Sequence, residues 1–66
     1  MKIIVNGEHR DVPEASTIAE LLHQFGLAGK YVAVEVNRQV IPRARHGEHR
    51  VQAGDFLEIV TLVGGG

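Results

Sequence analysis

Three glycines at the end of the chain could carry a reactive group on a thin arm. The apolar segment 56–63, predicted to be a strand, runs directly into Gly64, Gly65 and Gly66, and the terminal carboxylate belongs to Gly66. Because glycine has no Cβ, such a tail can enter a channel that is too narrow for any other residue. The pattern indicates a carboxyl group that another protein reaches and modifies; an ordinary frayed chain end is the alternative.

Histidine is the other residue type that could do chemistry, but the spacing of the four histidines does not support a metal site. His46 and His49 would share one face of a helix, whereas Gly47 between them favours a loop. The chain has no cysteine, which excludes thiolate ligands, disulfides and cysteine nucleophiles. Without a second ligand pair, we predict no metal site.

Residues 43–50 form a basic stretch in which Glu48 is the only acidic residue. No aromatic residues alternate with the basic ones, as they do in proteins that bind single strands. The formal net charge of −1 also argues against binding of nucleic acid by overall charge. We expect a solvated loop here; the alternative is electrostatic matching to an acidic partner surface.

The length of the chain limits the function further. A chain of 66 residues makes one domain, and at this size only about 60% of the unfolded surface becomes buried. A deep substrate pocket would compete with that small core, so we expect a binding or carrier module and not a stand-alone enzyme. No apolar run is long enough to span a membrane and no signal-peptide pattern is present. We therefore expect a cytoplasmic protein without a membrane partner.

The first half of the chain predicts a hairpin followed by a helix. Asn6-Gly7 is a strong turn signal, because a type I′ turn needs positive φ at both positions. Thr17 and Glu20 fit a helix capping box, and Gly26 suits the position just after the helix end. Between them, core residues at helical spacing form one apolar stripe: Ile18, Leu21, Leu22 and Phe25.

One helix and four or five strands make up the expected fold. Strands are predicted at 1–5, 8–12, 31–37, 39–41 and 56–63. A single helix can cover one face of such a sheet, which gives a two-layer α+β fold. The first and last strands are strongly apolar, so we place both near the centre of the sheet.

The last predicted strand is apolar on both sides, which a single helix cannot cover. Leu57 and Ile59 can meet the helix, so the residues that alternate with them must face outward. The open sheet face then carries four apolar side chains: Ile4, Phe56, Val60 and Leu62. A contiguous exposed apolar patch usually marks a partner site, and a partner on this patch would have the terminal carboxylate in reach. We predict a docking face; the alternative is that these side chains are scattered or covered by a loop.

Five segments, the last of which ends in Gly-Gly, together make the whole chain similar to one known family: 1–7, 17–22, 32–37, 42–43 and 54–66. Their order and spacing resemble the ThiS family, the ubiquitin-like sulfur carriers of thiamin biosynthesis. The resemblance implies an α+β, β-grasp fold with a mixed four- to five-stranded sheet and one main helix across one face. It also implies a domain at 1–63 and a flexible glycine tail at 64–66.

For this family, the resemblance implies that partners modify the Gly66 carboxylate. An E1-like adenylyltransferase (ThiF) would adenylate it with ATP and magnesium, and a sulfur donor such as a cysteine desulfurase would convert it into a thiocarboxylate. Thiazole synthase (ThiG) would then take the sulfur into the thiazole ring. Gly65 and Gly64 would fit the tail into partner active sites, with Gly64 as a spacer. The chain would be a carrier that binds no cofactor itself.

Two other functions fit the same residues. A related sulfur carrier on this fold would supply sulfur for molybdopterin, for cysteine or for tRNA thiolation. Residues 60–63, however, lack the proline that precedes Gly-Gly in the molybdopterin relatives. A ubiquitin-like interaction module without chemistry would use only the face formed by Phe56, Val60 and Leu62. Such a module would tolerate residues added after Gly66, whereas a carrier would not.

Overall fold

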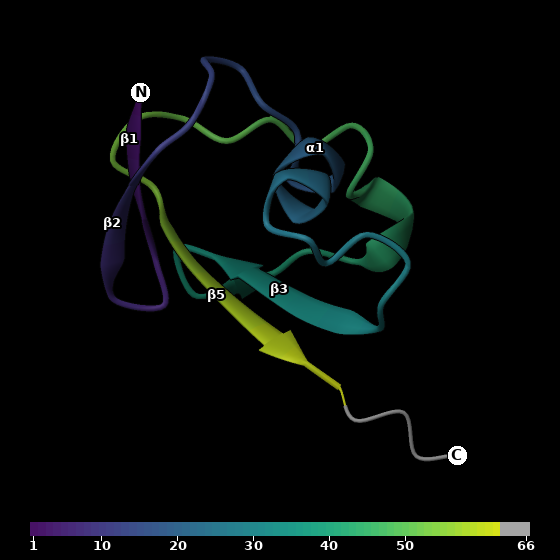
Figure 1. Cartoon of the computed structure of the whole chain (residues 1–66). Helices are drawn as coiled ribbons and strands as arrows, with labels where there is room; N and C mark the ends of the chain where they lie inside the picture. The colour runs from purple at the N-terminus through teal and green to yellow at the C-terminus, as the bar shows by residue number, and fades with distance from the viewer. Residues whose placement is uncertain (63–66) are drawn as a thin grey trace.

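The structure is a computed structural model that describes residues 1–62. Within these residues the chain forms β1 (Lys2–Val5), β2 (Glu8–Asp11), α1 (Ile18–Gln24), β3 (Val32–Val36), β4 (Gln39–Val40), a 3-10 helix η1 (Arg43–Arg45) and β5 (Phe56–Thr61). The helix lies across one face of the sheet, above β3 and β5 in Figure 1. The predicted two-layer α+β fold is confirmed, while the predicted tail at 64–66 lies outside the described residues.

The sheet is mixed, and β5 lies at its centre. The strand order is β2-β1-β5-β3-β4. β5 runs parallel to β1 and antiparallel to β3, and the other two pairs are antiparallel hairpins. The prediction that the first and last strands lie near the centre is confirmed, because each has a strand on both sides.

The two hairpins turn at residues with positive φ. Asn6 and Gly7 have φ angles of 51° and 82°, and Asn37 and Arg38 have φ angles of 51° and 68°. A type I′ turn needs this conformation at both central positions, so the predicted Asn6-Gly7 turn is confirmed. Arginine rarely adopts it, and Arg38 therefore carries a conformational cost in the second turn.

The helix begins at the predicted capping box. The Thr17 N–H donates to Glu20 Oε1 over 2.8 Å, and the Glu20 N–H donates to Thr17 Oγ1 over 3.1 Å. The hydrogen bond from the Thr17 backbone, and then the one with its side chain, lower the pKa of the Glu20 carboxyl; the positive charge of Arg50 adds to this effect. Beyond the helix, Gly26 has a φ of 74°, as expected for the position after a helix end.

The core lies between the helix and the covered face of the sheet. Leu57 and Ile59 point into it from β5, as predicted. Phe25 is less buried than predicted, because it stands one residue beyond the helix at its C-cap. Its ring packs against the edge of the core, and the Arg10 guanidinium covers it at 4.9 Å from the ring centre. The buried apolar residues among those described are Ile3, Val5, Val12, Ile18, Leu21, Leu22, Val34, Val36, Ile41, Val51, Leu57 and Ile59.

The prediction of a solvated loop over the basic stretch is wrong for His46. This side chain is buried, and its Nε2 lies 3.0 Å from the carbonyl oxygen of Ile41. The stretch also closes the start of the helix, because the N–H groups of Ile18 and Ala19 donate to the carbonyl oxygens of His49 and His46. The first N–H groups of a helix have no partner inside it. The basic stretch is therefore a structural part of the helix layer.

We expect Thr17→Ala to lower the free energy of unfolding by about 1 kcal/mol, because it removes the oxygen that caps the helix. Thr17→Ser keeps this oxygen and is the matched control. The pKa of the Glu20 carboxyl is lower in the folded state than in the unfolded state. The ionised carboxylate therefore stabilises the fold at pH values above the unfolded-state pKa. This stabilisation is lost as the pH falls through the folded-state pKa. The cost of Thr17→Ala should therefore shrink in acid. Urea unfolding at about pH 7 and about pH 3 measures it, and an equal cost at both would contradict the coupling.

Candidate functional site

Four apolar side chains share the sheet face that the helix leaves uncovered. Phe56, Val60 and Leu62 are 60%, 55% and 51% exposed. Ile4 is half-buried and lies beside Phe56 in the register of β1 and β5. The structure thus places the four predicted residues on one exposed side of the sheet, which we call the open face.

The open face is hollowed where β1 and β5 meet the first hairpin. The hollow is shallow and measures about 700 Å³. It is lined by Ile4, Asn6, Gly7, His9, Phe56, Leu57 and Glu58. Apolar and polar groups therefore alternate around it, so that a partner side chain could pack against Phe56 and also find hydrogen-bonding groups.

Asn6 fastens β5 to β1 beyond the end of their backbone pairing. That pairing reaches Val5 and Leu57. One step further, Asn6 Oδ1 accepts a hydrogen bond from the Ile59 N–H over 2.8 Å, and Asn6 Nδ2 donates to the Ile59 carbonyl oxygen over 3.1 Å. The amide side chain thus substitutes for the backbone of a longer β1 and holds the middle of β5 in place.

The open face extends to the last described residue. The Leu62 N–H donates to the carbonyl oxygen of Tyr31 over 2.8 Å, and the Arg43 guanidinium lies 5.0 Å from the centre of the Tyr31 ring. Leu62 is therefore both a member of the open face and the start of the sequence that leads to the glycines. The predicted site residues of the tail lie outside the described residues: Gly64, Gly65 and Gly66.

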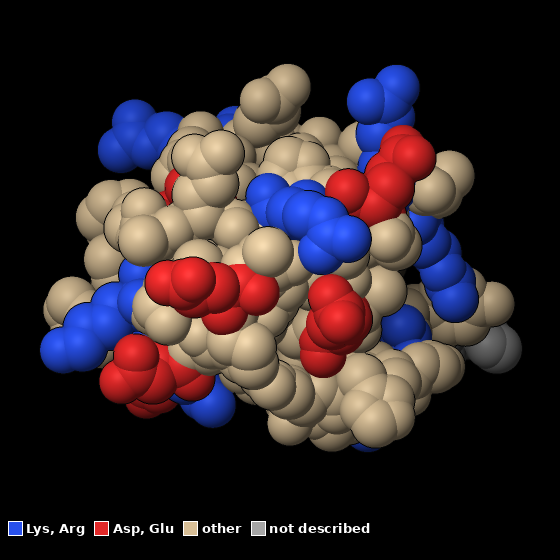
Figure 2. Space-filling model, turned by 90° about the horizontal axis from the view of Figure 1, so that it is seen from above, with Lys and Arg blue, Asp and Glu red and all other residues tan. Residues whose placement is uncertain are grey.

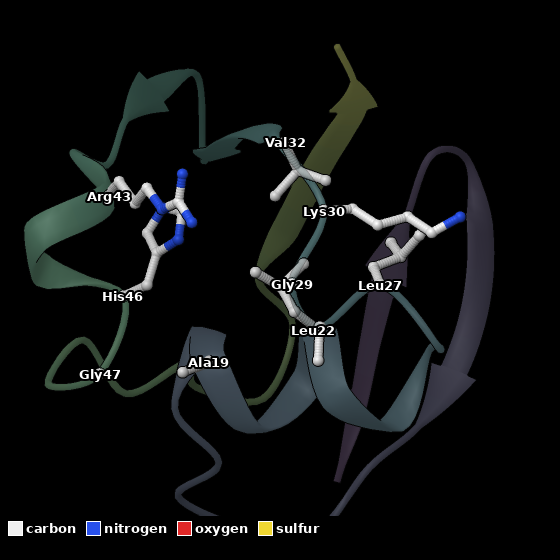
Figure 3. A pocket seen from close by; sticks show the side chains of 10 residues that line it. Ala19, Leu22, Leu27, Gly29, Lys30, Val32, Arg43, His46 and Gly47 are labelled. Carbon is white, nitrogen blue, oxygen red and sulfur yellow. The ribbon is translucent and has the colours of Figure 1, made fainter. Parts of the chain in front are cut away.

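A second hollow lies in the helix layer, between α1, the α1–β3 loop and η1. It measures about 280 Å³. Figure 3 shows Arg43 and His46 on one wall and Leu22 and Leu27 across from them, while Lys30 extends away from Arg43. Among residues 1–62, no carboxylate lines this hollow, and the groups that line it are basic and apolar.

The face of the molecule seen from above in Figure 2 is mixed in charge. Figure 2 shows Lys and Arg side chains among Asp and Glu on the face seen from above, with no large area of one sign. Within residues 1–62, no three His, Cys, Asp or Glu side chains lie close enough together to hold a metal ion. The helices of this range also lack the length and apolar character needed to cross a membrane. The open face is thus the most distinctive part of the described surface.

The whole chain is similar to proteins of one family. Residues 3–66 match the model of the ThiS family. The chain belongs to the ThiS family. It is 30% identical to the sulfur carrier protein ThiS of Escherichia coli over all of both chains. Its structure also matches the crystal structure of the thiamine biosynthesis protein (ThiS) from Geobacter metallireducens, with a TM-score of 0.85 and 35% identity over all of both chains. The predicted β-grasp fold is confirmed by this match.

Some relatives contain a ThiS-like segment within a longer chain. The thiazole synthase of Paramagnetospirillum magneticum is 39% identical over 66 residues, which is all of this chain and 20% of that protein. The same identity and coverage are found for the thiazole synthase of Magnetococcus marinus. The ThiS-family chain described here therefore spans about a fifth of the length of these two relatives.

The sequence alone does not reveal the polar members of the site. It predicts only a turn at Asn6, because the bonds to Ile59 depend on the register of two strands that lie far apart in the chain. Val40 of β4 is also missed; it is 64% exposed and pairs with Glu35 on the open face. A shift of one residue in that register would turn Val40 to the other side, so its position follows only from the folded hairpin.

We expect Asn6→Gly to lower the free energy of unfolding by about 1–3 kcal/mol, the range for leaving a buried hydrogen-bonding group without its partner. Glycine accepts the positive φ of this position, so the change reports the lost bonds to Ile59 and not strain in the turn. Arg38→Gly is the matched control, since it also removes a side chain at positive φ. Chemical denaturation compares the two, and equal effects would show that the Asn6 amide adds nothing to stability.

Proposed function

We propose that the chain is a sulfur carrier protein of thiamin biosynthesis, a cosubstrate whose partners supply the catalytic groups. The observation that carries this proposal is the similarity to the sulfur carrier protein ThiS of E. coli, which extends over all of both chains. A match of one segment alone would support only a shared fold. The glycines at 64–66 provide the thin arm that the role requires.

The proposed chemistry begins at the Gly66 carboxylate. This group is ionised at neutral pH and resists nucleophiles because it already carries a negative charge. A carboxylate oxygen attacks the α-phosphorus of ATP, pyrophosphate leaves, and an acyl-adenylate remains on Gly66. ATP and magnesium are bound by the E1-like adenylyltransferase in this scheme, so the carrier itself needs no cofactor.

Sulfur then replaces the adenylate. A persulfide, held by a donor such as a cysteine desulfurase, attacks the carbonyl carbon of Gly66 and AMP leaves. A thiol cleaves the sulfur–sulfur bond of the product, which releases the thiocarboxylate and leaves a disulfide. Throughout these steps the glycine arm provides access, while the folded domain provides the surface by which partners hold the carrier.

We assign the open face as the surface that holds thiazole synthase. In the thiazole synthase of P. magneticum, a segment similar to this chain belongs to the same polypeptide, which supports an association between the two. Phe56 and Val60 lie on the strand that leads toward the glycine arm, so a partner packed on them is close to the end of β5. The E1-like enzyme needs the same access, and the two partners would therefore bind in turn.

Alkylation with a thiol-directed reagent, followed by mass spectrometry, tests the carrier function. The chain has no cysteine, so a thiocarboxylate would be its one strong sulfur nucleophile. We expect a single alkyl group on Gly66 after incubation with ATP, magnesium, an E1-like adenylyltransferase and a sulfur donor. Absence of the label, under conditions in which the E. coli carrier is labelled, would overturn the proposal.

A chain with one alanine added after Gly66 is the matched control for that experiment. Its fold should be unchanged, but the added Cβ should keep the terminal carboxylate out of the adenylation channel. We expect no alkyl label on this variant. Equal labelling of both chains would show that the Gly-Gly ending does not determine loading.

We expect Val60→Asp to weaken binding to thiazole synthase with little loss of stability, because the side chain is exposed and lies on the open face. Ala19→Asp, at an exposed position of the helix layer, adds the same charge away from the open face. Isothermal titration and thermal unfolding of both variants give the comparison. A large loss of stability in Val60→Asp, or equal weakening by both variants, would contradict the assignment of the open face.

A further inference from the structure

Two glutamates face each other in the middle of the open face. Glu35 of β3 and Glu58 of β5 are register partners in the antiparallel ladder. Asn37 and Phe56 are opposite each other two residues further along the same ladder, and the Asn37 N–H donates to the carbonyl oxygen of Phe56 over 2.7 Å. In an antiparallel ladder, hydrogen-bonded pairs recur at every second residue. Glu35 and Glu58 are therefore also a hydrogen-bonded pair, with Cα atoms about 5.5 Å apart.

Both glutamate side chains stand on the side of the sheet away from the helix. The residues next to each glutamate are buried in the core, so the glutamates between them must point the other way: Val34, Val36, Leu57 and Ile59. Glu58 is exposed, and Glu35 is half-buried. The two carboxylates thus share one surface, and like charges directly opposite each other destabilise a sheet.

Within residues 1–62, no basic side chain forms an ion pair or hydrogen bond with either glutamate. Arg38, in the second hairpin turn, lines a hollow beside Glu58, but within residues 1–62 no ion pair or hydrogen bond joins it to Glu58 or Glu35. Lys2 is also on this side of the sheet, but it lies toward the far end of β1, opposite Asp11. Basic side chains are thus near Glu58, because His9 and Arg38 each line a hollow beside it, but the described residues place none of them between the two carboxylates.

Apolar side chains surround the two carboxylates. Phe56 and Val60 stand on either side of Glu58 along β5, and Val40 lies opposite Glu35 in β4. A partner that packs on these apolar groups must also cover the carboxylates between them. Covering two charges with a purely apolar surface is costly, because neither gains a partner for the water it loses.

The charge pattern disfavours a second copy of the chain at the centre of this surface. A two-fold dimer places the same patch against itself. A dimer whose axis passes near the Glu35–Glu58 pair would bring two copies of the pair together, and the repulsion would increase. The charge pattern thus selects a different protein with the opposite charge at this point.

We propose that the partner on the open face inserts a basic side chain between Glu35 and Glu58; the identity of that partner, thiazole synthase, rests on the proposed function. Arginine suits the position best, because its planar guanidinium can donate to two carboxylates at once. The apolar groups around it exclude water and strengthen the ion pairs. The open face is then specific for an apolar surface with a basic side chain at its centre.

Glu35→Gln and Glu58→Gln test this inference in the full chain. Each removes the repulsion, so each should raise the thermal midpoint of unfolding of the free carrier. Each should also weaken binding to thiazole synthase about tenfold, because the partner's cation loses one of its two acceptors. Glu48→Gln removes the same charge from the basic stretch and should change neither quantity by a comparable amount.

Glu58→Lys separates the two effects further. It creates an attractive cross-strand pair with Glu35, so the free carrier should become more stable, while binding to thiazole synthase should fall at least as far as in Glu58→Gln. Wild-type affinity should also decrease between about 50 mM and about 500 mM salt, and this dependence should be weaker in both glutamine variants. Unchanged or tighter binding by the three variants would overturn the inference.

A parallel measurement separates failure of this inference from failure of the proposed function. Alkyl labelling of Gly66 reports sulfur loading and does not require thiazole synthase. Labelled wild-type chain that does not bind thiazole synthase would overturn the inference and leave the carrier function intact. The opposite result is wild-type chain that binds thiazole synthase through both glutamates but gains no alkyl label on Gly66. That result would support the inference and overturn the proposed sulfur loading.

Discussion

The seven-residue helix α1 covers only one face of the five-stranded sheet, and the rest of the structure depends on this limit. All of the buried apolar side chains among the described residues gather in one cluster. Because nothing in residues 1–62 packs on the other side, any apolar side chain there stays in contact with water. The exposed Phe56, Val60 and Leu62 follow from that arrangement. The open face is therefore available for a partner, as proposed above.

The central strand β5 joins the core to the open face. Its inward residues complete the core, and its outward residues lie on the open face. Its position is fixed by bonds from both neighbours: the Asn6 amide holds Ile59 from the β1 side, and Asn37 accepts from the Phe56 N–H from the β3 side. Asparagine serves at both places because its side chain carries the same donor and acceptor as a peptide group. A rigid β5 gives a partner a fixed surface beside the sequence that leads to the glycines.

Features that depend on nearby residues could be predicted from the sequence. The capping box of Thr17, the turn at Asn6-Gly7 and the two faces of β5 all follow from spacings of a few residues, and the structure confirms them. The burial of His46 could not be predicted, because it depends on contact between the basic stretch and the helix start. Likewise, Glu35 and Glu58 become neighbours only through the register of β3 and β5. The periodicity of apolar residues within one strand does not show which residues of a distant strand lie opposite it.

In the proposed function, a carrier that serves several partners needs a surface that binds each partner and then releases it. A wholly apolar open face would favour self-association, since exposed apolar strands pack against one another. The Glu35–Glu58 pair opposes this, because its repulsion remains in any contact that lacks a basic group. A like-charged pair is also expected to weaken the free sheet slightly, and in the proposal a partner with the right charge relieves this repulsion on binding. In the proposed role, the same two carboxylates would oppose contact between copies of the chain and favour a partner of opposite charge, which a purely apolar surface of equal area could not do.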